Sequence, residues 1–312
     1  MLKQSMCVEY GRHLVRMAKK YSRLIALEAD LKESTQSVQF QQSYPNRFIE
    51  VGVAEQNMIG IAAGLALAGK IPVTHSFASF TSMRACEQIR TSVAYPRLNV
   101  KFVATHSGIS AGSAGTTHHA IEDIAIMRSI PNMTVLVPGD AKETRQVLEA
   151  ALSWRGPVYI RLCACDVEDV CGANDNFSIG RATTLREGGD LTIITTGAMM
   201  YNGVKVSEKL REIGIKARVL QMASVKPIDR EAIIKAANDT GCIITIEEHN
   251  IIGGLGGAVC EITAELCSAK IKRIGINDHF CGVGSYSYLI KQEGLCVENI
   301  IKTILNFIKN KK

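Results

Sequence analysis

Short apolar runs rich in β-branched residues alternate along the chain with segments of helical periodicity. Runs without polar alternation are typical of parallel strands buried on both faces. We therefore expect an α/β fold with helix-covered parallel sheets. The predicted strands span residues 48–51, 99–104, 133–137, 158–162, 191–195, 217–221, 242–247 and 272–276. The predicted helices span residues 54–68, 140–152, 201–212, 229–238 and 257–267.

The alternation breaks over residues 163–179, where asparagine, aspartate and glycine accumulate. Such polar composition is typical of a linker or an edge segment. The break divides the chain into two α/β domains, residues 1–165 and residues 181–312, with a linker at 166–180.

Composition narrows the class of protein. Of 312 residues, 46% are hydrophobic and 21% are charged, which excludes a disordered or fibrous chain. The longest uncharged apolar stretch, residues 58–69, is too short to span a bilayer. The N-terminus shows no signal segment, so we expect a cytoplasmic protein without a membrane partner. The net charge of +6 includes no basic run interleaved with aromatics, which argues against nucleic-acid binding.

The ten cysteines include no CxxC pair. Cys163, Cys165 and Cys171 cluster, but no fourth ligand has zinc-like spacing. We expect reduced thiols and no metal site on this chain.

Three segments carry candidate chemistry. Glu55 stands at the start of an apolar helix. Glutamates are common in the first turn of helices because the helix dipole stabilises a negative charge there. Phe77 and Phe80 can form a flat apolar surface or pack in the core. The loop over residues 105–119 is rich in glycine and contains His106 and His118, which suits a polar ligand.

A run of glycines over residues 253–257 precedes the last predicted helix. It is either a turn that allows close helix packing or an anion-binding helix terminus. We favour packing, because no lysine or catalytic group accompanies the run.

Several motifs occur together in a fixed order. They are RFIEVGVAEQNMIGIAAGLALAGK, SFASF with RACEQIR, ATHSGISAG with TTHHAIEDIA, MRSIPNMTVLVPGD, VKPID and TIEEHNIIGGLGGAV. In this order the chain resembles the second half of transketolase. The family's GDG motif is absent, so the chain resembles the C-terminal subunit of a split transketolase, with a pyrimidine-binding domain followed by a C-terminal domain. The resemblance implies a partner subunit that carries the diphosphate and metal site, in an α2β2 heterotetramer.

The resemblance implies thiamine diphosphate as cofactor, with Mg²⁺ ligands on the partner chain. The cofactor's C2 carbon must lose a proton before it attacks a ketose carbonyl. In the family a glutamate that matches Glu55 holds the pyrimidine ring nitrogen, and burial beside an apolar helix favours the shared-proton state of such a carboxyl group. Phe77 or Phe80 would stack on the pyrimidine. The spacing from Phe80 to Arg84 differs by one residue from some relatives, which leaves open which ring stacks.

The resemblance also assigns substrate contacts. His106 and His118 match histidines that reach the sugar, and His118 is a candidate proton relay. Ser34 matches a serine that touches the substrate phosphate.

Departures from the family pattern concern the substrate. Ala114 replaces an aspartate, Ala164 replaces a phosphate-binding arginine, and Cys7 aligns loosely with a second such arginine. Each lost charge-assisted bond weakens binding by about 1.5–3 kcal/mol. We therefore expect an atypical sugar substrate, unless Arg161 or Arg84 compensates.

Two alternatives remain at this stage. One is the β subunit of a 2-oxoacid dehydrogenase E1 component, which has a related AEQ motif. The other is a non-catalytic, regulatory subunit, which Ala114 and Ala164 favour because they lack the functional side chains of the family.

Overall fold

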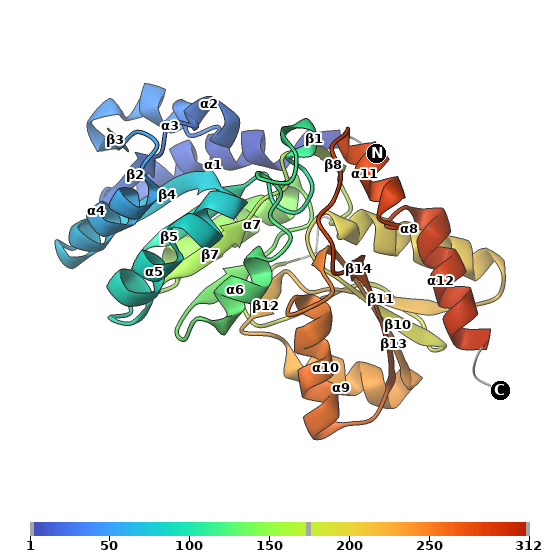
Figure 1. The fold of residues 1–312 in the computed structure, drawn as a ribbon. Coiled ribbons are helices and arrows are strands. Elements are labelled where there is room, and N and C mark those ends of the chain that lie inside the picture. The colour runs from blue at the N-terminus through green and yellow to red at the C-terminus, as the bar shows by residue number, and fades with distance from the viewer. Residues whose placement is uncertain (1–2, 173–175, 310–312) are drawn as a thin grey trace.

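The computed structural model describes residues 3–172 and 176–309. It contains sheets of seven and five strands and a two-stranded ribbon. The first sheet and its helices, blue to green, lie beside the second sheet, yellow to red (Figure 1). The predicted α/β fold with parallel sheets is confirmed, and each large sheet also has one antiparallel edge strand.

The first sheet has the strand order β12-β6-β7-β5-β4-β2-β3, in which only β12 is antiparallel. Its strands are β2 (Leu24–Glu28), β3 (Phe48–Glu50), β4 (Ile71–Phe77), β5 (Lys101–Thr105), β6 (Thr134–Leu136), β7 (Val158–Arg161) and β12 (Ser224–Lys226). Its helices are α1 (Met6–Lys20), α2 (Lys32–Thr35), α3 (Val38–Ser43), η1 (Pro45–Arg47), α4 (Glu55–Leu67), η2 (Phe80–Arg84), α5 (Cys86–Gln88), η3 (Ile89–Ala94), η4 (Gly112–Ala114), α6 (Asp123–Ser129) and α7 (Ala141–Ser153).

Helices cover both faces of this sheet, as its apolar strands require. In the central strand β5, Phe102 and Ala104 belong to an apolar cluster with α4 and α6. Val103, between them, belongs to a second cluster with α1 and α7. Successive side chains of a strand point to opposite faces, so both faces of β5 are core.

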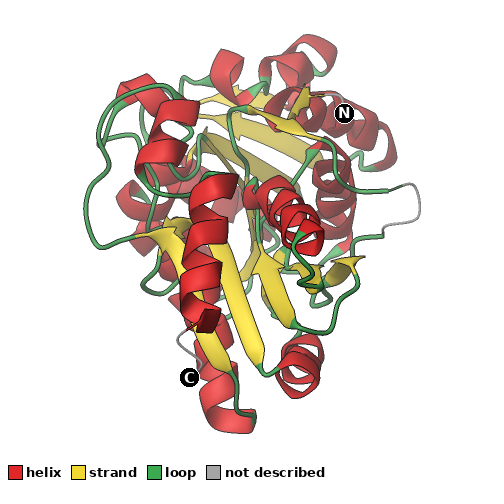
Figure 2. Ribbon diagram, turned by 90° about the vertical axis from the view of Figure 1, so that its right-hand side faces the viewer, coloured by secondary structure: helices red, strands yellow, loops and turns green. Residues whose placement is uncertain are grey.

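The second sheet has the order β14-β13-β10-β11-β9, and β9 is its antiparallel edge. Helices again enclose the strands (Figure 2). The strands are β9 (Thr183–Arg186), β10 (Leu191–Thr195), β11 (Ala217–Gln221), β13 (Cys242–Asn250) and β14 (Lys270–Ile276). The helices are α8 (Met199–Glu212), α9 (Arg230–Thr240), α10 (Leu255–Leu266), α11 (Tyr286–Gln292) and α12 (Val297–Lys309).

Strand pairing and side-chain hydrogen bonds connect the two halves of the chain and the polar segment between them. β1 (Lys3–Ser5) pairs with β8 (Asp166–Glu168), which lies within the polar segment of residues 163–179. Residues 173–175 of that segment lie outside the described residues. β12 comes from the second half but pairs with β6 in the first sheet. The Lys226 ammonium group also donates to the carbonyl oxygens of Arg128 and Ile130, at 2.8 and 2.6 Å.

The sequence pattern did not predict α1, β2 or β4. In β4, Thr74, His75 and Ser76 are buried polar residues, which interrupt the apolar pattern of a central strand. The His75 side chain is fully satisfied, because its Nδ1 bonds the Leu27 carbonyl oxygen and its Nε2 accepts from the Tyr10 hydroxyl. Burial lowers the pKa of His75 to about 4, which keeps it neutral.

Side chains of the chain itself satisfy the N-termini of two helices. Asp140 accepts a hydrogen bond from the Glu143 N–H at 2.8 Å, and Glu143 accepts from the Gly139 N–H at 2.7 Å. This arrangement at the start of α7 is a capping box whose return bond is made one residue before the cap. At α10, the Glu247 carboxylate accepts from the N–H groups of Leu255 and Gly256.

The glycine run therefore allows close packing around a carboxylate of the chain itself. A Cβ atom at Gly254 would overlap the Glu247 carboxylate. The helix N-terminus is thus already occupied by an internal anion.

In the described part of the chain, no helix has the length and apolar character needed to cross a bilayer.

Candidate active site

The predicted site residues lie at the ends of three parallel strands of the first sheet. Phe77 is the last residue of β4, His106 follows β5, and Glu55 begins α4 after β3. Carboxyl ends of parallel strands meet at one edge of a sheet, which is where ligands bind in open α/β folds. The topology therefore brings these residues to the same edge.

Glu55 is buried, with 1% of its surface exposed. Its carboxylate accepts a hydrogen bond from the Ser76 hydroxyl at 3.1 Å. Both carboxylate oxygens also lie 2.9 Å from Nη1 of Arg84. Sequence reasoning expected an apolar environment for Glu55 and missed this ion pair.

An aromatic cluster of four predicted site residues lies beside this pair. The rings of Phe77 and His106 stack with centroids 3.9 Å apart, and those of Phe77 and Phe80 lie 5.7 Å apart at 20°. The His118 ring meets Phe80 edge-on at 5.2 Å. The structure therefore brings Phe77, Phe80, His106 and His118 together.

Phe80 begins a π-helical turn that ends at Arg84. The Ala85 N–H bonds to the Phe80 carbonyl oxygen at 3.3 Å, an i to i+5 bond. A π-turn absorbs one extra residue in a helix, and such turns are frequent at functional sites. The one-residue difference in spacing between Phe80 and Arg84 falls on this turn. The turn also places the Arg84 guanidinium 4.1 Å above the Phe80 ring.

His106 adopts a left-handed backbone conformation, with φ of 55°. Its Nδ1 lies 3.0 Å from the Thr105 hydroxyl. Burial, with a smaller effect of His118, lowers the pKa of His106 to about 4. His106 is therefore neutral at physiological pH and can donate or accept one hydrogen bond with a ligand.

The second half of the chain fixes the loop of residues 105–119, which contains His106 and His118 and is called the histidine loop below. The Glu248 carboxylate at the end of β13 accepts from the Ile109 N–H at 2.7 Å and from the Tyr286 hydroxyl at 2.7 Å. Gly108 has φ of 59°, and a Cβ atom there would overlap Glu248. Only glycine meets both demands.

Ser34 lies apart from the aromatic cluster in the described contacts. It is exposed on the short helix α2, which contacts β4. Glu28, at the end of β2, accepts from the Thr35 hydroxyl at 2.7 Å and from the Ser37 hydroxyl at 2.5 Å. These bonds fix the segment around Ser34, while burial raises the pKa of Glu28 to about 7.

The two arginines offered as phosphate ligands are both engaged elsewhere. Arg161 is 4% exposed, and its Nε donates to Asp123 at 2.8 Å. Its Nη2 donates to the carbonyl oxygens of Ala120 and Glu248. The expectation that Arg161 could hold a substrate phosphate is therefore wrong, and Arg84 binds Glu55.

The positions that lack family residues are also placed. Ala114 is exposed on η4, and Ala164 is half-buried just after β7. Cys7 is buried and donates to the Cys163 carbonyl oxygen, so this position cannot present an arginine to a substrate without rebuilding the core.

No disulfide joins any of the ten cysteines, all of which lie within the described residues. In the part of the chain that the structure describes, Cys163, Cys165 and Cys171 do not converge as a metal-ligand group.

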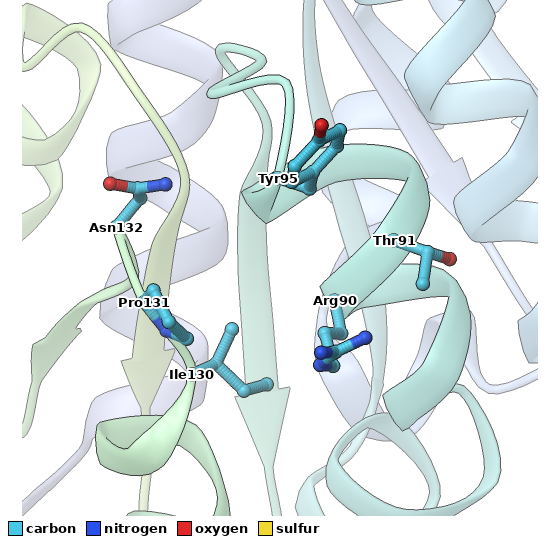
Figure 3. A pocket seen from close by; sticks show the side chains of 6 residues that line it. All are labelled: Arg90, Thr91, Tyr95, Ile130, Pro131 and Asn132. Atoms are coloured by element: carbon cyan, nitrogen blue, oxygen red, sulfur yellow. The ribbon is translucent and has the colours of Figure 1, made fainter.

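Two cavities of similar volume differ in their relation to the candidate site. One, of about 430 Å³, opens beside the ion pair. Its lining comprises Ser79, Phe80, Met83, Arg84, Thr116, Thr117, His119, Glu122 and Phe280. The other, of about 440 Å³, lies between η3 and the loop after α6 and contains none of the predicted site residues (Figure 3).

Comparison with known proteins agrees with this geometry. Residues 3–166 match the transketolase pyrimidine binding domain, and residues 180–300 match the transketolase C-terminal domain. A transketolase C-terminal section from Methanocaldococcus jannaschii is 48% identical over 303 residues, covering 96% of this chain and 95% of that protein. A 6-deoxy-6-sulfo-D-fructose transketolase subunit from Clostridium sp. strain MSTE9 is 45% identical, covering 93% of this chain and 90% of that protein.

A solved structure of a split gene transketolase, described as an inactive β4 tetramer, superposes with a TM-score of 0.92. It is 42% identical and covers 99% of both chains. These relatives favour transketolase over the β subunit of a 2-oxoacid dehydrogenase. The chain belongs to the transketolase family, as a C-terminal subunit of the split type.

Proposed function

We propose that this chain supplies the pyrimidine-binding half of a thiamine diphosphate-dependent transketolase, which transfers a two-carbon ketol unit from a ketose to an aldose. The observation that carries the proposal is the Glu55 carboxylate, buried at the strand edge beside an aromatic cluster. Membership of the transketolase family implies the cofactor, whose carbon nucleophile would supply the chemistry.

The residues present fit the aminopyrimidine of that cofactor. Glu55 offers a buried acceptor for a ring N–H group, and Phe77 and Phe80 offer flat apolar faces. Arg84 now occupies the acceptor, so it must release Glu55 when the cofactor binds. Its side chain is 45% exposed, which gives it room to move. The cost of removing it is offset by the new hydrogen bond to Glu55.

His106 and His118 would act on the sugar. Both rings lie against the phenylalanines, so they face the same volume. Neutral His106 can donate or accept one hydrogen bond, and we assign His118 the role of proton relay. Ser34 would contact the sugar from the neighbouring helix α2.

A partner subunit would complete the site. The sequence lacks the GDG motif, so we place the diphosphate and Mg²⁺ ligands on an N-terminal chain in an α2β2 assembly. The inactive tetramer of the related split transketolase supports this, since it contains β chains alone. Val53 and Leu67, on or next to α4, are 72% and 74% exposed, as expected for an interface.

The substrate is proposed to carry its charge in a different place from common sugar phosphates. Ala114 and Ala164 remove one carboxylate and one guanidinium, and buried Arg161 does not replace the latter. The Clostridium relative is named for a sugar with a sulfonate. A sulfonated, branched or unphosphorylated ketose is therefore the favoured donor.

Substitution Glu55→Gln tests the proposal most simply. In the enzyme reconstituted with its partner, we expect kcat to fall at least about 100-fold, because an amide cannot share the pyrimidine proton. Steady-state ketol transfer measures this. The exposed Glu87→Gln serves as the matched control and should retain wild-type activity. The chain without its partner sets the zero-activity reference, and undiminished turnover by Glu55→Gln would refute the role of Glu55.

The pH dependence of catalysis tests His106. Because its pKa is lowered to about 4, His106 stays neutral as the pH falls from 8 to 5 and protonates only below that range. We expect His106→Asn to lower kcat/KM about 100-fold at every pH between 5 and 8, without changing the shape of the profile. A wild-type acid limb near pH 6.5 that vanishes in the variant would contradict this assignment.

Restoring the missing cation tests the substrate. We expect Ala164→Arg to raise kcat/KM for xylulose 5-phosphate about 10-fold or more, since one charge-assisted bond is worth about 1.5–3 kcal/mol. The half-buried Cys165→Arg is the positional control. If wild type already uses xylulose 5-phosphate far better than unphosphorylated xylulose, the atypical-substrate proposal fails.

A further inference from the structure

A group of three different metal-binding side chains lies on the second half of the chain. A ring nitrogen of His279, Sγ of Cys281 and a carboxylate oxygen of Glu293 all lie within 4.8 Å of one another. His279 and Cys281 come from the loop between β14 and α11, and Glu293 follows the end of α11. A single ion bound to all three would therefore join that loop to the far end of the helix.

The three groups differ in how far they are buried. Cys281 is 3% exposed and the Glu293 side chain is 8% exposed, whereas the His279 side chain is 49% exposed. Cys281 and Glu293 are thus fixed by the packing around them, whereas the exposed His279 side chain can change its rotamer. The His279 Nε2 atom lies 2.9 Å from the Glu293 carboxylate. The two side chains therefore need to move only a little to bind one ion between them.

Basic side chains also lie near the group. Lys272, Arg273 and Lys302 line the cavity next to Glu293, so carboxylates alone would bind weakly and the thiolate becomes the decisive ligand.

We propose that His279, Cys281 and Glu293 form a zinc site with water in the fourth position. Imidazole, thiolate and carboxylate are the ligands that Zn²⁺ takes in proteins, and three protein ligands plus water is a common arrangement. This site is separate from the Mg²⁺ expected on the partner chain and does not rest on the proposed function.

The position of the loop gives the site a consequence. The Cys281 carbonyl oxygen accepts a hydrogen bond from the Thr116 hydroxyl at 2.9 Å, and Thr116 belongs to the histidine loop. Phe280 lines the same cavity as Phe80 and Arg84. Bound Zn²⁺ would therefore fix the loop of residues 277–285 at the mouth of the candidate active site.

Cobalt titration of the metal-free full-length chain tests the proposal. We expect one Co²⁺ per chain with a thiolate-to-cobalt charge-transfer band in the near ultraviolet, which Zn²⁺ abolishes. Cys281→Ser should lose the band, and Glu293→Gln should weaken binding at least about 10-fold. The partly exposed Cys267→Ser is the matched control and should keep the band.

His279→Gln guards against a folding artefact, because His279 is exposed and its replacement leaves the core intact. It should also weaken Co²⁺ binding at least about 10-fold. Hydrogen exchange should slow on Zn²⁺ binding over residues 277–285. Absence of a thiolate band in wild type, an unchanged band in Cys281→Ser, or protection around residues 163–171 instead would overturn the proposal.

Discussion

Glu248 reaches from the second sheet into the first half of the chain and holds the histidine loop by its backbone. A buried carboxylate must be hydrogen-bonded, and Ile109 and Tyr286 supply the donors. Gly108 leaves the space that the carboxylate fills. Arg161, bound to Asp123 and to the Glu248 carbonyl oxygen, braces the same junction. The position of His106 in the first domain therefore depends on the packing of the second.

The ion pair of Glu55 and Arg84 explains how a binding carboxylate can stay buried before its ligand arrives. Burying an unpaired charge costs free energy of desolvation. A partner that stays partly exposed to solvent neutralises the charge with a smaller desolvation cost than a fully buried partner. Arg84 meets this need because its guanidinium group lies over the Phe80 ring and its side chain is 45% exposed. A ligand that offers Glu55 an N–H group can replace the arginine without leaving the carboxylate unsatisfied at any stage.

The sequence predicts what local pattern and ordered motifs encode. The predicted strands 191–195 and 217–221 match β10 and β11. The ordered motifs also predict Phe77, Phe80, His106 and His118 as site residues, and the structure brings these four rings together. They predict Glu55 as well, which lies beside this cluster. The sequence pattern does not predict β4, because its central residues are polar and therefore do not look like a buried strand. In the structure, partners far away in the sequence satisfy such residues, as Tyr10 does for His75. Arg84 and Arg161 look alike in sequence, and only tertiary contacts show that one is half-exposed and the other buried. No sequence spacing reveals that Glu248 contacts a loop 139 residues away.

Hydrogen–deuterium exchange at C2 of bound thiamine diphosphate tests the central claim most directly. It isolates cofactor activation from sugar binding and from later steps of turnover. In the reconstituted complex, the account predicts that wild type exchanges this proton much faster than free cofactor, and that Glu55→Gln exchanges at about the free rate while still binding the cofactor. Rapid exchange in Glu55→Gln, equal to wild type, would show that the buried carboxylate does not activate the cofactor.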